Sequence, residues 1–220
     1  MNNTIILKNI SKNFNKLHIL NDITYSFYEN KFYGIAGESG VGKTTLLQCL
    51  GTIDNFSSGE LYILGQSVKK MTNKEKAQLR NKHIGFIFQS FLLNDKLTAV
   101  ENVMLPMLIT NHSLKECKQK AEQLLTDIGL GQRLSHYPKQ LSGGEQQRTA
   151  IARALANNPS IILADEPTGN LDQNNEQKII DIFHNLAHNY GKTVIMVTHN
   201  IALLNQVDYV LKLEDGNLKF

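Results

Sequence analysis

The sequence predicts an α/β fold with a mostly parallel sheet, an N-terminal antiparallel β layer and a helical lobe. Short apolar runs rich in β-branched or aromatic residues recur along the chain, and helix-like stretches separate several of them. This alternation is typical of a parallel sheet whose strands are joined by helices. The early stretch Asn2–Tyr33 differs, because it is strand-like and carries no long helix. It indicates a small antiparallel layer beside the parallel sheet.

Apolar runs bounded by polar or glycine-containing turns are expected to be buried strands. They are Thr4–Leu7, Phe32–Ala36, Ile84–Phe88, Ile161–Ala164, Thr193–Val197 and Tyr209–Leu213. Leu114–Ile128 is expected to be a helix, since Ser113 and Glu116 have the spacing of a capping box at its start. Asn174–Asn189 has the amphipathic pattern of a second helix.

The length of 220 residues suits one domain, 1–220, with the helical lobe at about 90–156. Hydrophobic residues make up 41% of the chain and charged residues 20%, which argues against intrinsic disorder. The longest apolar run, Val103–Ile109, is far shorter than the roughly 18 residues of a membrane helix and contains Pro106. Met1–Lys12 lacks the long apolar core of a secretory signal. We therefore expect a chain that does not itself cross a membrane.

The near balance of 23 basic and 20 acidic residues gives a net charge of +3, which provides no electrostatic basis for nucleic-acid binding. The basic cluster Lys69–Lys82 includes Glu75 and is interpreted as the solvated face of a helix. Cys49 and Cys117 lack metal-ligand spacing and are too few for a disulfide framework. We expect both to be reduced thiols of a cytosolic protein.

The segment Gly37–Thr45 fits the spacing G-x-x-x-x-G-K-[ST] and lies between a predicted strand and the helix-like Thr45–Leu50. Glycines let successive backbone N–H groups form a nest for anionic oxygens, and the helix N-terminus adds partial positive charge. Lys43 can reach the β- and γ-phosphates of a nucleotide, and the Thr44 hydroxyl can ligate Mg²⁺. The predicted phosphate-binding residues are Gly37, Glu38, Ser39, Gly40, Val41, Gly42, Lys43, Thr44 and Thr45. The motif predicts that the α/β fold has a P-loop NTPase core.

Nucleotide binding alone suits GTPases, small-molecule kinases and transport ATPases alike. The chain has no N-K-x-D stretch for guanine recognition, since Asn81–Ile84 lacks the aspartate. A guanine-specific enzyme is therefore disfavoured, and the remaining motifs must decide between the other classes.

Ile161–Glu166 is an apolar strand that ends in two carboxylates. Because neighbouring side chains on an extended strand point to opposite sides, Asp165 and Glu166 can do different work. Asp165 is placed to hold Mg²⁺, and Glu166 is placed to accept a proton from an attacking water. The alternative is that these two carboxylates are only the polar end of a strand where it meets a turn. The Gly37–Thr45 loop in the same chain favours the catalytic interpretation.

Leu141–Arg148 begins with a capping box, in which Ser142 is the N-cap and Glu145 follows three residues later. Gly143 and Gly144 open the backbone at the same helix N-terminus, which attracts anions. The segment therefore predicts a second phosphate-binding surface in one polypeptide, in addition to its local capping role.

In this order and spacing, the motifs resemble those of the ATP-binding subunits of ABC transporters over nearly the whole chain. The corresponding elements are the Walker A loop Gly37–Thr45, the Q-loop residue Gln89, the signature Leu141–Arg148, the Walker B strand Ile161–Glu166, the D-loop Gly169–Asp172 and the switch histidine His199. The resemblance implies a Mg²⁺-dependent ATPase. It also implies a dimer with a second copy, in which each signature closes over the ATP held by the other copy's Walker A loop.

The resemblance further implies a role for each motif residue. Catalytic roles fall to Glu166, His199, Gln89 and Lys43, and magnesium binding falls to Thr44, Gln89 and Asp165. Nucleotide contacts across the dimer fall to Ser142, Gly143, Gly144, Glu145 and Asp172. The adenine ring would stack on Phe14, where the family more often has tyrosine; the alternative is that Phe14 belongs to the core.

A finer resemblance is to the macrolide-exporter and lipoprotein-releasing subfamily. It rests on Phe86–Phe91, Leu97–Val103, Tyr137, Pro138 and Asp165–Asp172. The subfamily implies an integral-membrane permease with few transmembrane helices and a large outer domain, docking near Phe91–Ile109. The chain would then lie peripherally at the cytoplasmic face of the bacterial membrane. Met104 and Met107 suit such a docking surface, because methionine adapts to irregular shapes; the alternative is that they belong to the core of the helical lobe.

Two alternatives stand beside the exporter. The first is an ATP-driven regulator that signals through a permease-like partner, as the cell-division ATPase of this subfamily does. The sequence does not separate the two, because the difference lies in the permease. The second is a soluble ATPase acting on ribosomes or DNA, which is disfavoured because this chain has neither tandem ATPase halves nor a long coiled-coil insertion. Peptides, antimicrobial compounds, lipoproteins and haem-like molecules are all compatible as exported substrates, because none of them touches this subunit.

Overall fold

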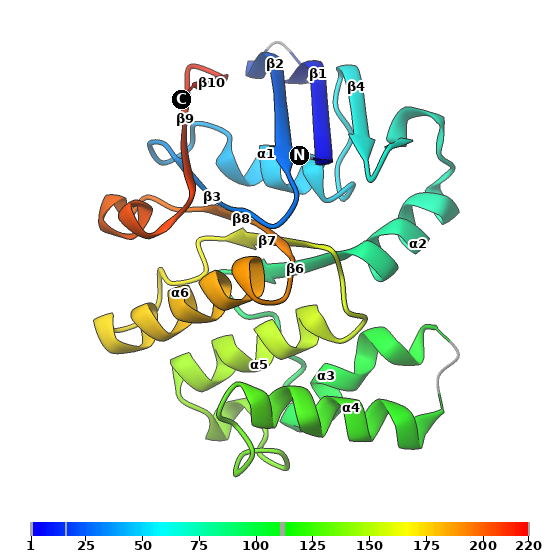
Figure 1. Cartoon of the computed structure of the whole chain (residues 1–220), viewed down its shortest axis with the longest axis vertical. Coiled ribbons are helices and arrows are strands. Elements are labelled where there is room, and N and C mark those ends of the chain that lie inside the picture. The colour runs from blue at the N-terminus through cyan, green and yellow to red at the C-terminus, as the bar shows by residue number, and fades with distance from the viewer. Residues whose placement is uncertain (1, 16, 111–112, 220) are drawn as a thin grey trace.

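A central sheet of mixed direction organises the molecule (Figure 1). The computed structural model describes residues 2–15, 17–110 and 113–219. The sheet has the strand order β10-β9-β3-β8-β7-β6, and all neighbours are parallel except the antiparallel pair β9–β10. Its strands are β3 (Phe32–Ala36), β6 (Ile84–Phe88), β7 (Ile161–Asp165), β8 (Thr193–Val197), β9 (Tyr209–Glu214) and β10 (Asn217–Lys219). The mostly parallel sheet is therefore confirmed.

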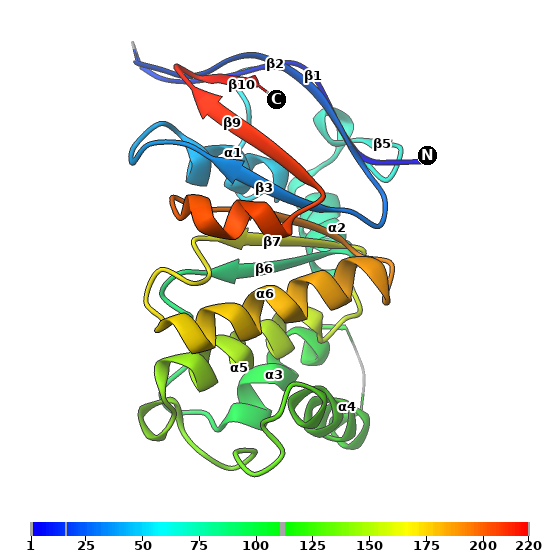
Figure 2. The ribbon, with the colours of Figure 1, turned by 60° about the vertical axis from the view of Figure 1, so that its left-hand side comes forward.

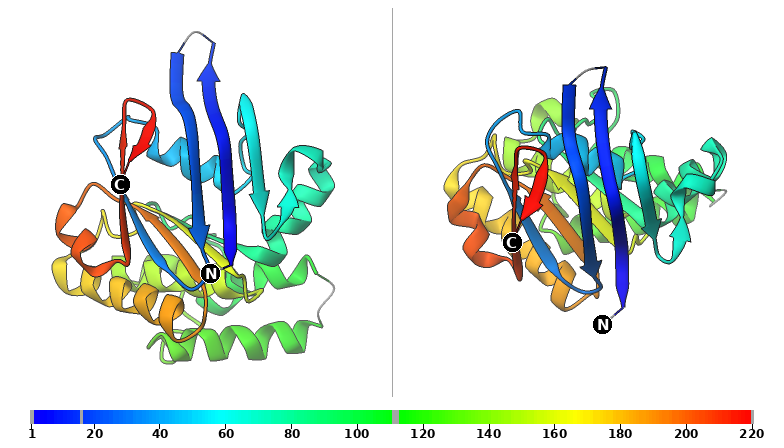
Figure 3. Two further views of the ribbon diagram at one scale, coloured as in Figure 1. Left: turned by 45° about the horizontal axis from the view of Figure 1, so that its top comes forward. Right: turned by 90° about the horizontal axis from the view of Figure 1, so that it is seen from above.

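A second, antiparallel sheet has the strand order β2-β1-β4-β5, and its long strands lie side by side in Figure 3. Its strands are β1 (Asn3–Phe14), β2 (Leu17–Tyr28), β4 (Ser58–Ile63) and β5 (Gln66–Ser67). The predicted antiparallel layer is confirmed, and the predicted strand Thr4–Leu7 is part of the longer β1. The layer also extends beyond Asn2–Tyr33, because β4 pairs with β1 and places Ile63 opposite Ile5.

Helix α1 (Lys43–Leu50) lies between the two sheets (Figure 2). Leu46, Leu47 and Leu50 are fully buried on it. They join one hydrophobic cluster with side chains from β1, β2 and β4 on one side and from β7, β8 and β9 on the other. Burial of apolar area at about 25 cal/mol per Å² is the main stabilising contribution to such a layered core. The first helix is thus fixed on both faces, and so is the loop that precedes it.

The opposite face of the central sheet is covered by α5 (Gly143–Leu155) and α6 (Gln173–His188). Phe183 of α6 is fully buried and meets Phe32 of β3 edge to face, with ring centroids 5.9 Å apart. The predicted helix Asn174–Asn189 is confirmed within one residue at each end. Parallel strands that are buried on both faces have continuous apolar sequences. Every residue of β7 and β8 is buried, and for this reason both strands could be predicted from the sequence.

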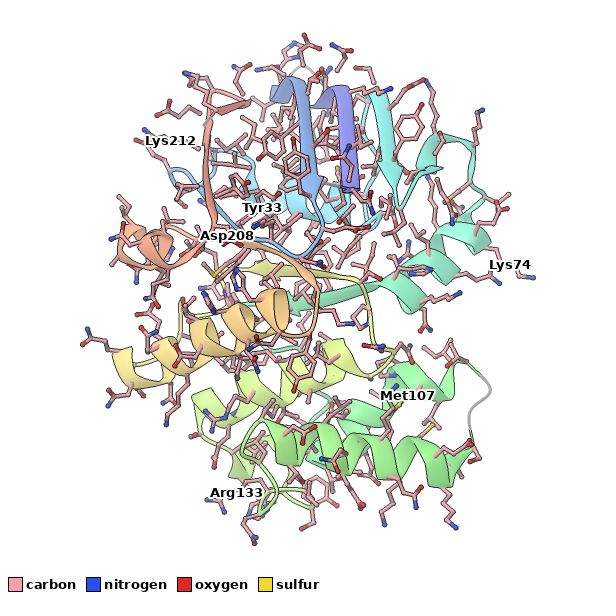
Figure 4. All side chains as sticks on the ribbon, in the orientation of Figure 1. Tyr33, Lys74, Met107, Arg133, Asp208 and Lys212 are labelled. Carbon is pink, nitrogen blue, oxygen red and sulfur yellow. The ribbon has the colours of Figure 1, made fainter. Side chains whose placement is uncertain are left out.

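The helical lobe consists of α3 (Ala99–Leu108), α4 (Leu114–Asp127) and the adjoining part of α5, packed around a hydrophobic cluster of their own. The capping box of Ser113 and Glu116 is present at the start of α4, as predicted. For Met104 and Met107 the sequence left two alternatives, a docking surface or the core of the lobe, and the structure places both in the core. Met104 is 9% exposed and Met107 is 2% exposed, because α3 turns both into the lobe cluster, where Figure 4 shows Met107.

Helix α2 (Asn73–His83) lies at the edge of the molecule, and Leu79 is its one buried residue. The interpretation of Lys69–Lys82 as a solvated helical face is confirmed over the part that is α2. Short 3-10 turns complete the described elements at Val68–Lys70, Pro138–Gln140 and Ile201–Gln206. Among the described residues, no helix combines the length and the apolar composition that crossing a bilayer requires.

Both cysteines are free and buried. Cys49 lies on α1 and Cys117 on α4, so they belong to different hydrophobic regions. Burial raises the pKa of the Cys49 thiol to about 12, which keeps it protonated near neutral pH. Both side chains are unpaired thiols, as the sequence predicts.

Asn102 on α3 ties the lobe to the preceding loop and is fully buried. Its side-chain nitrogen donates to the carbonyl oxygens of Asn94 (3.1 Å), Leu97 (3.0 Å) and Thr98 (3.0 Å). Its side-chain oxygen accepts from the Asn94 backbone nitrogen at 2.8 Å. A buried amide that satisfies several backbone groups holds the loop between β6 and α3 in one conformation.

We predict that Asn102→Ala lowers the free energy of unfolding by about 2–3 kcal/mol, because it leaves buried backbone groups without partners. Urea denaturation followed by circular dichroism measures this. The control is Asn205→Ala, an exposed asparagine, which should change stability by less than about 0.5 kcal/mol. Equal effects of the two substitutions would contradict the bonding role of Asn102.

Candidate active site

The loop Gly37–Gly42 joins β3 to α1 and is shaped by three of its glycines. Gly40 and Gly42 have φ angles of 79° and 106°, which lie in the left-handed region that glycine adopts without strain. A Cβ on Gly42 would lie 2.7 Å from Ile19 Cγ2, and one on Gly37 would lie 2.7 Å from the Leu213 carbonyl oxygen. The loop therefore passes between β2 and β9 too closely for any larger residue.

Lys43, the first residue of α1, extends its ammonium group back into the loop. Its Nζ donates to the carbonyl oxygens of Gly37 at 2.8 Å and Glu38 at 2.9 Å. The same nitrogen lies 3.8 Å from Glu166 Oε1, and the residue is 7% exposed. A positive charge thus lies at the helix N-terminus, where the helix dipole also favours an anion.

Thr44 and Asp165 bring a hydroxyl and a carboxylate together at the end of β7. Thr44 Oγ1 donates to Asp165 Oδ1 at 3.0 Å. Burial raises the pKa of Asp165 above its ordinary value, and the hydrogen bond from Thr44 opposes that rise. Hard oxygen donors of this kind suit a divalent cation such as Mg²⁺, which would also favour the ionised carboxylate.

Glu166 has a φ angle of 46°, an uncommon conformation for a non-glycine residue, and its backbone nitrogen donates to the Val197 carbonyl oxygen at 3.1 Å. Its Oε2 accepts from the His199 backbone nitrogen at 3.2 Å and lies 2.8 Å from His199 Nδ1. Strained backbone is often found at functional sites. Asp165 and Glu166 thus have different partners, one on α1 and the other after β8.

A cavity of about 400 Å³ brings four separate segments of the chain together. Its lining residues are Ser39, Gly40, Gly42, Lys43, Thr44, Thr45, Gln89, Glu166 and His199. They come from the loop after β3 and from the carboxyl ends of β6, β7 and β8, where open α/β sheets place their ligands. The remaining predicted loop residues, Gly37, Glu38 and Val41, lie beside this lining; the carbonyls of Gly37 and Glu38 hold Lys43.

Gln89 follows β6, whose last residue, Phe88, pairs with Asp165 of β7. The Gln89 carbonyl oxygen accepts from Asn170 Nδ2 at 3.1 Å. A Cβ on Gly169 would lie 2.8 Å from Gln89 Nε2, so this glycine lets the glutamine side chain lie against the backbone. The sequence placed Asn170 in the D-loop but gave no sign that it holds Gln89, because the two are far apart in the chain.

The signature residues lie elsewhere: among the described residues that line the cavity, none belongs to Leu141–Arg148. The predicted capping box is present, with Ser142 Oγ accepting from the Glu145 nitrogen at 3.3 Å. Glu145 also accepts from Arg133 Nε at 2.8 Å. The bond from Arg133, followed by that from the Ser142 backbone, lowers the pKa of Glu145 to about 2. The carboxylate is therefore ionised and engaged within its own chain.

Asp172 caps the N-terminus of α6 and lies close to the signature helix. Its carboxylate accepts from the Asn175 backbone nitrogen at 2.9 Å and from Asn175 Nδ2 at 2.6 Å. The backbone bond from Asn175 lowers the pKa of Asp172 below its ordinary value. A Cβ on Gly144 would lie 2.4 Å from Asn175 Oδ1, so this glycine allows the first turns of α5 and α6 to approach.

Phe14 lies at the end of β1 and is 48% exposed, so it is not part of the core. One face of its ring meets Lys12 Nζ, 4.5 Å from the ring centroid. Lys12 is fixed by an ion pair with Asp54 at 2.6 Å. Phe14 is not among the described residues that line the 400 Å³ cavity, and it presents an exposed aromatic ring outside it.

The sequence profile of the family described as "ABC transporter" matches residues 20–169. The chain is 46% identical over 211 residues to a lipoprotein-releasing system ATP-binding protein, LolD, from Porphyromonas gingivalis, and the match covers 96% of each chain. It is 45% identical over 202 residues to a macrolide export ATP-binding/permease protein, MacB, from Rhodopirellula baltica, covering 91% of this chain and 30% of that one.

A solved structure is similar over almost the full length. It is the dimeric, post-hydrolysis state of the ATP-binding cassette MJ0796 bound to ADP and Pi, with a TM-score of 0.90 and 38% identity over 98% of this chain and 97% of that chain. The chain described here belongs to the ABC transporter family. It is an ATP-binding and ATP-hydrolysing subunit of that family, built on a P-loop NTPase fold.

Proposed function

We propose that two copies of this chain close on two ATP molecules and thereby drive a membrane permease. The observation that carries the proposal is the separation, within one chain, of the cavity at Lys43 from the helix N-terminus at Ser142. A complete site then requires the signature of a second copy. The dimeric state of the similar MJ0796 cassette supports this arrangement.

In this proposal, the Gly37–Thr45 loop holds the phosphates of ATP, with Lys43 neutralising the β- and γ-phosphates. The position of Lys43 favours this role, because its side chain is buried and its ammonium group is hydrogen-bonded to the carbonyls of the same loop. Phe14 is proposed to stack on the adenine ring with its exposed face. Lys12 covers one face of the Phe14 ring, and the other face is left for the adenine ring.

We assign Mg²⁺ binding to Thr44, Asp165 and Gln89, because each side chain carries an oxygen atom of the kind that Mg²⁺ prefers as a ligand. Thr44 and Asp165 are within hydrogen-bond distance of each other, and Gln89 lines the same cavity. When bound, Mg²⁺ supplies positive charge to the phosphate oxygens as the γ-phosphate leaves. The position of the Gln89 side chain would then depend on whether the γ-phosphate and its Mg²⁺ are present.

Glu166 is proposed to be the general base that takes a proton from the attacking water. Its Oε2 is oriented by His199, through both the ring and the backbone nitrogen, and its Oε1 faces Lys43. A base fixed by bonds on one oxygen can keep the other lone pairs aimed at a water molecule. His199 would also contact the γ-phosphate and hold the geometry of the transition state.

Across the proposed dimer, Ser142, Gly143 and Gly144 would meet the phosphates bound by the partner copy, with the helix N-terminus of α5 supplying partial positive charge. Glu145 would hold this surface in shape through its bond to Arg133. Asp172 would contact the partner's site from the neighbouring helix N-terminus. Because α5 and α6 meet at Gly144, these groups would move together.

We further propose that the permease docks beside α2 and α3, near Phe91–Ile109. A groove of about 750 Å³ runs there and continues into one of about 430 Å³ that includes Leu105. Ile109 is 75% exposed in it, so an apolar side chain is available to a partner. The groove also includes Lys74, which extends from α2 in Figure 4, and Lys120. An apolar permease segment that carries carboxylates would complement this lining.

The LolD and MacB relatives, named for lipoprotein release and macrolide export, support an exporter. We therefore propose that this chain, acting as one ATPase domain over residues 1–220 with its helical lobe at about 90–156, is held at the cytoplasmic face of the membrane by its permease. Docking in this groove would place the partner against the helical lobe, so that ATP-driven closure moves the permease.

The catalytic assignment predicts that Glu166→Gln cuts ATP turnover by roughly 10²–10⁴-fold, because the amide cannot accept the proton. ATP binding should be retained, and a dimer should accumulate with ATP. Steady-state turnover, calorimetric ATP binding and size-exclusion chromatography measure these effects. Glu122→Gln, the same change on the surface of α4, is the control and should leave turnover unchanged. Near-normal turnover in Glu166→Gln would show that another group is the base.

The permease assignment predicts what Glu166→Gln, locked with ATP, captures from native membranes. It should recover a permease with few transmembrane helices and a large outer domain, identified by mass spectrometry. The matched bait adds Ile109→Asp in the groove, where burying a charge against an apolar partner is costly. This second bait should lose the permease. Recovery of a many-helix permease, of no membrane protein, or of equal amounts on both baits would contradict the assignment.

A further inference from the structure

The segment directly after Gln89 has an uncommon backbone conformation. Phe91 and Leu92 have φ angles of 58° and 51°, so two consecutive non-glycine residues lie in the left-handed region. In that region the Cβ crowds the backbone, and a side chain of this size rarely adopts it. The Phe91 nitrogen donates to the Phe88 carbonyl oxygen at 3.3 Å and the Leu92 nitrogen to that of Ser90 at 2.5 Å. These local bonds form a tight turn that includes the backbone carbonyls of Phe91 and Leu92.

Arg153 binds both of those carbonyls from α5. Its Nη2 donates to the Phe91 carbonyl oxygen at 2.8 Å, and its Nη1 donates to that of Leu92. A planar guanidinium suits this task because its donors form a rigid fork. No ion pair to Arg153 is present among the residues 2–15, 17–110 and 113–219. Its charge is therefore directed at the two carbonyls, which stabilises the strained turn.

The same turn touches the signature. A Cβ on Gly143 would lie 3.9 Å from Phe91 Cζ, so the phenyl ring lies beside the N-terminus of α5. Arg153 lies near the opposite end of α5. The turn Ser90–Leu92 therefore contacts α5 twice. The ring of Phe91 lies beside the first turn of α5, and the carbonyls of Phe91 and Leu92 are bound by Arg153 in its last turn.

We propose that Arg153 is a positioning residue for Gln89, which fixes the Phe91–Leu92 turn to α5 so that the signature helix and the Q-loop side chain move as one unit. This rests on the proposed role of Gln89 in ATP hydrolysis. Arg153 also lines the 430 Å³ groove together with Leu105 and Ile109. A permease segment in the groove would therefore lie against the residue that sets the position of Gln89.

The first test is Arg153→Lys, which keeps the positive charge but cannot span both carbonyls. We expect kcat for ATP hydrolysis to fall by about tenfold with KM for ATP changed by less than about twofold, because the phosphate loop is untouched. The matched control is Arg80→Lys, since Arg80 also donates to a backbone carbonyl, that of Thr52 at 2.9 Å. It should leave kcat unchanged. An unchanged kcat in Arg153→Lys, or a parallel rise in KM, would overturn the proposal.

A double-mutant cycle with Gln89→Ala separates positioning from a general structural effect. If Arg153 acts through Gln89, Arg153→Lys should lower kcat by less than about twofold once Gln89 is alanine, since coupled residues are not additive. A full, additive loss in that background would overturn the proposal. So would a Gln89→Ala variant with normal kcat, although the ATPase assignment would stand through Glu166→Gln.

The turn itself gives a second route that leaves Arg153 in place. Leu92→Pro forbids the left-handed φ, whereas Leu92→Gly permits it, and the Leu92 side chain is 55% exposed. Leu92→Pro should lower kcat as Arg153→Lys does, and Leu92→Gly should lower it less. Because the chain contains no tryptophan, the fluorescence of a Phe91→Trp variant reports on the turn alone. Adding Arg153→Lys should loosen the turn and so increase the quenching of this fluorescence by acrylamide. Equal kcat in the two Leu92 variants, or unchanged quenching, would overturn the proposal.

Discussion

The close passage of the Gly37–Gly42 loop between two strands is the constraint on which the rest of the site depends. Gly42 lies against Ile19 of β2 and Gly37 lies against the Leu213 carbonyl of β9, so the loop is held by both sheets. Burial of α1 between those sheets then fixes its N-terminus. Every other group of the cavity is placed relative to this helix end by the carboxyl edges of β6, β7 and β8.

Within one chain, the charges near this loop largely satisfy one another. Lys43 rests on loop carbonyls and faces Glu166, while Thr44 bonds Asp165. Nucleotide phosphates would replace these internal contacts by stronger, charge-assisted ones. The signature at the start of α5 takes no part in this cavity, and its glutamate is bound to Arg133 at the outer end of the lobe (Figure 4). This separation within a single chain is the basis of the proposal that each complete site is shared by two copies.

The sequence was informative where structure is local and less so where it is not. Continuous apolar runs predicted β3, β6 and β8 to the residue, and side-chain spacing predicted the capping boxes at Ser113 and Ser142. Ser58–Ile63 escaped prediction because its burial alternates and its stability comes from pairing with β1, distant in the chain. Arg153 looked like any polar residue of an amphipathic helix, since only the folded chain brings it to Phe91.

The claim that each complete site is shared by two copies is tested most directly by mixing two inactive variants. Lys43→Ala should disable the phosphate loop of its own chain, and Ser142→Arg should disable its signature. Each variant alone should be inactive. In a mixture, the intact loop of the Ser142→Arg chain can meet the intact signature of the Lys43→Ala chain, so ATP hydrolysis should reappear. A mixture that hydrolyses ATP no faster than the two variants separately would contradict the shared site.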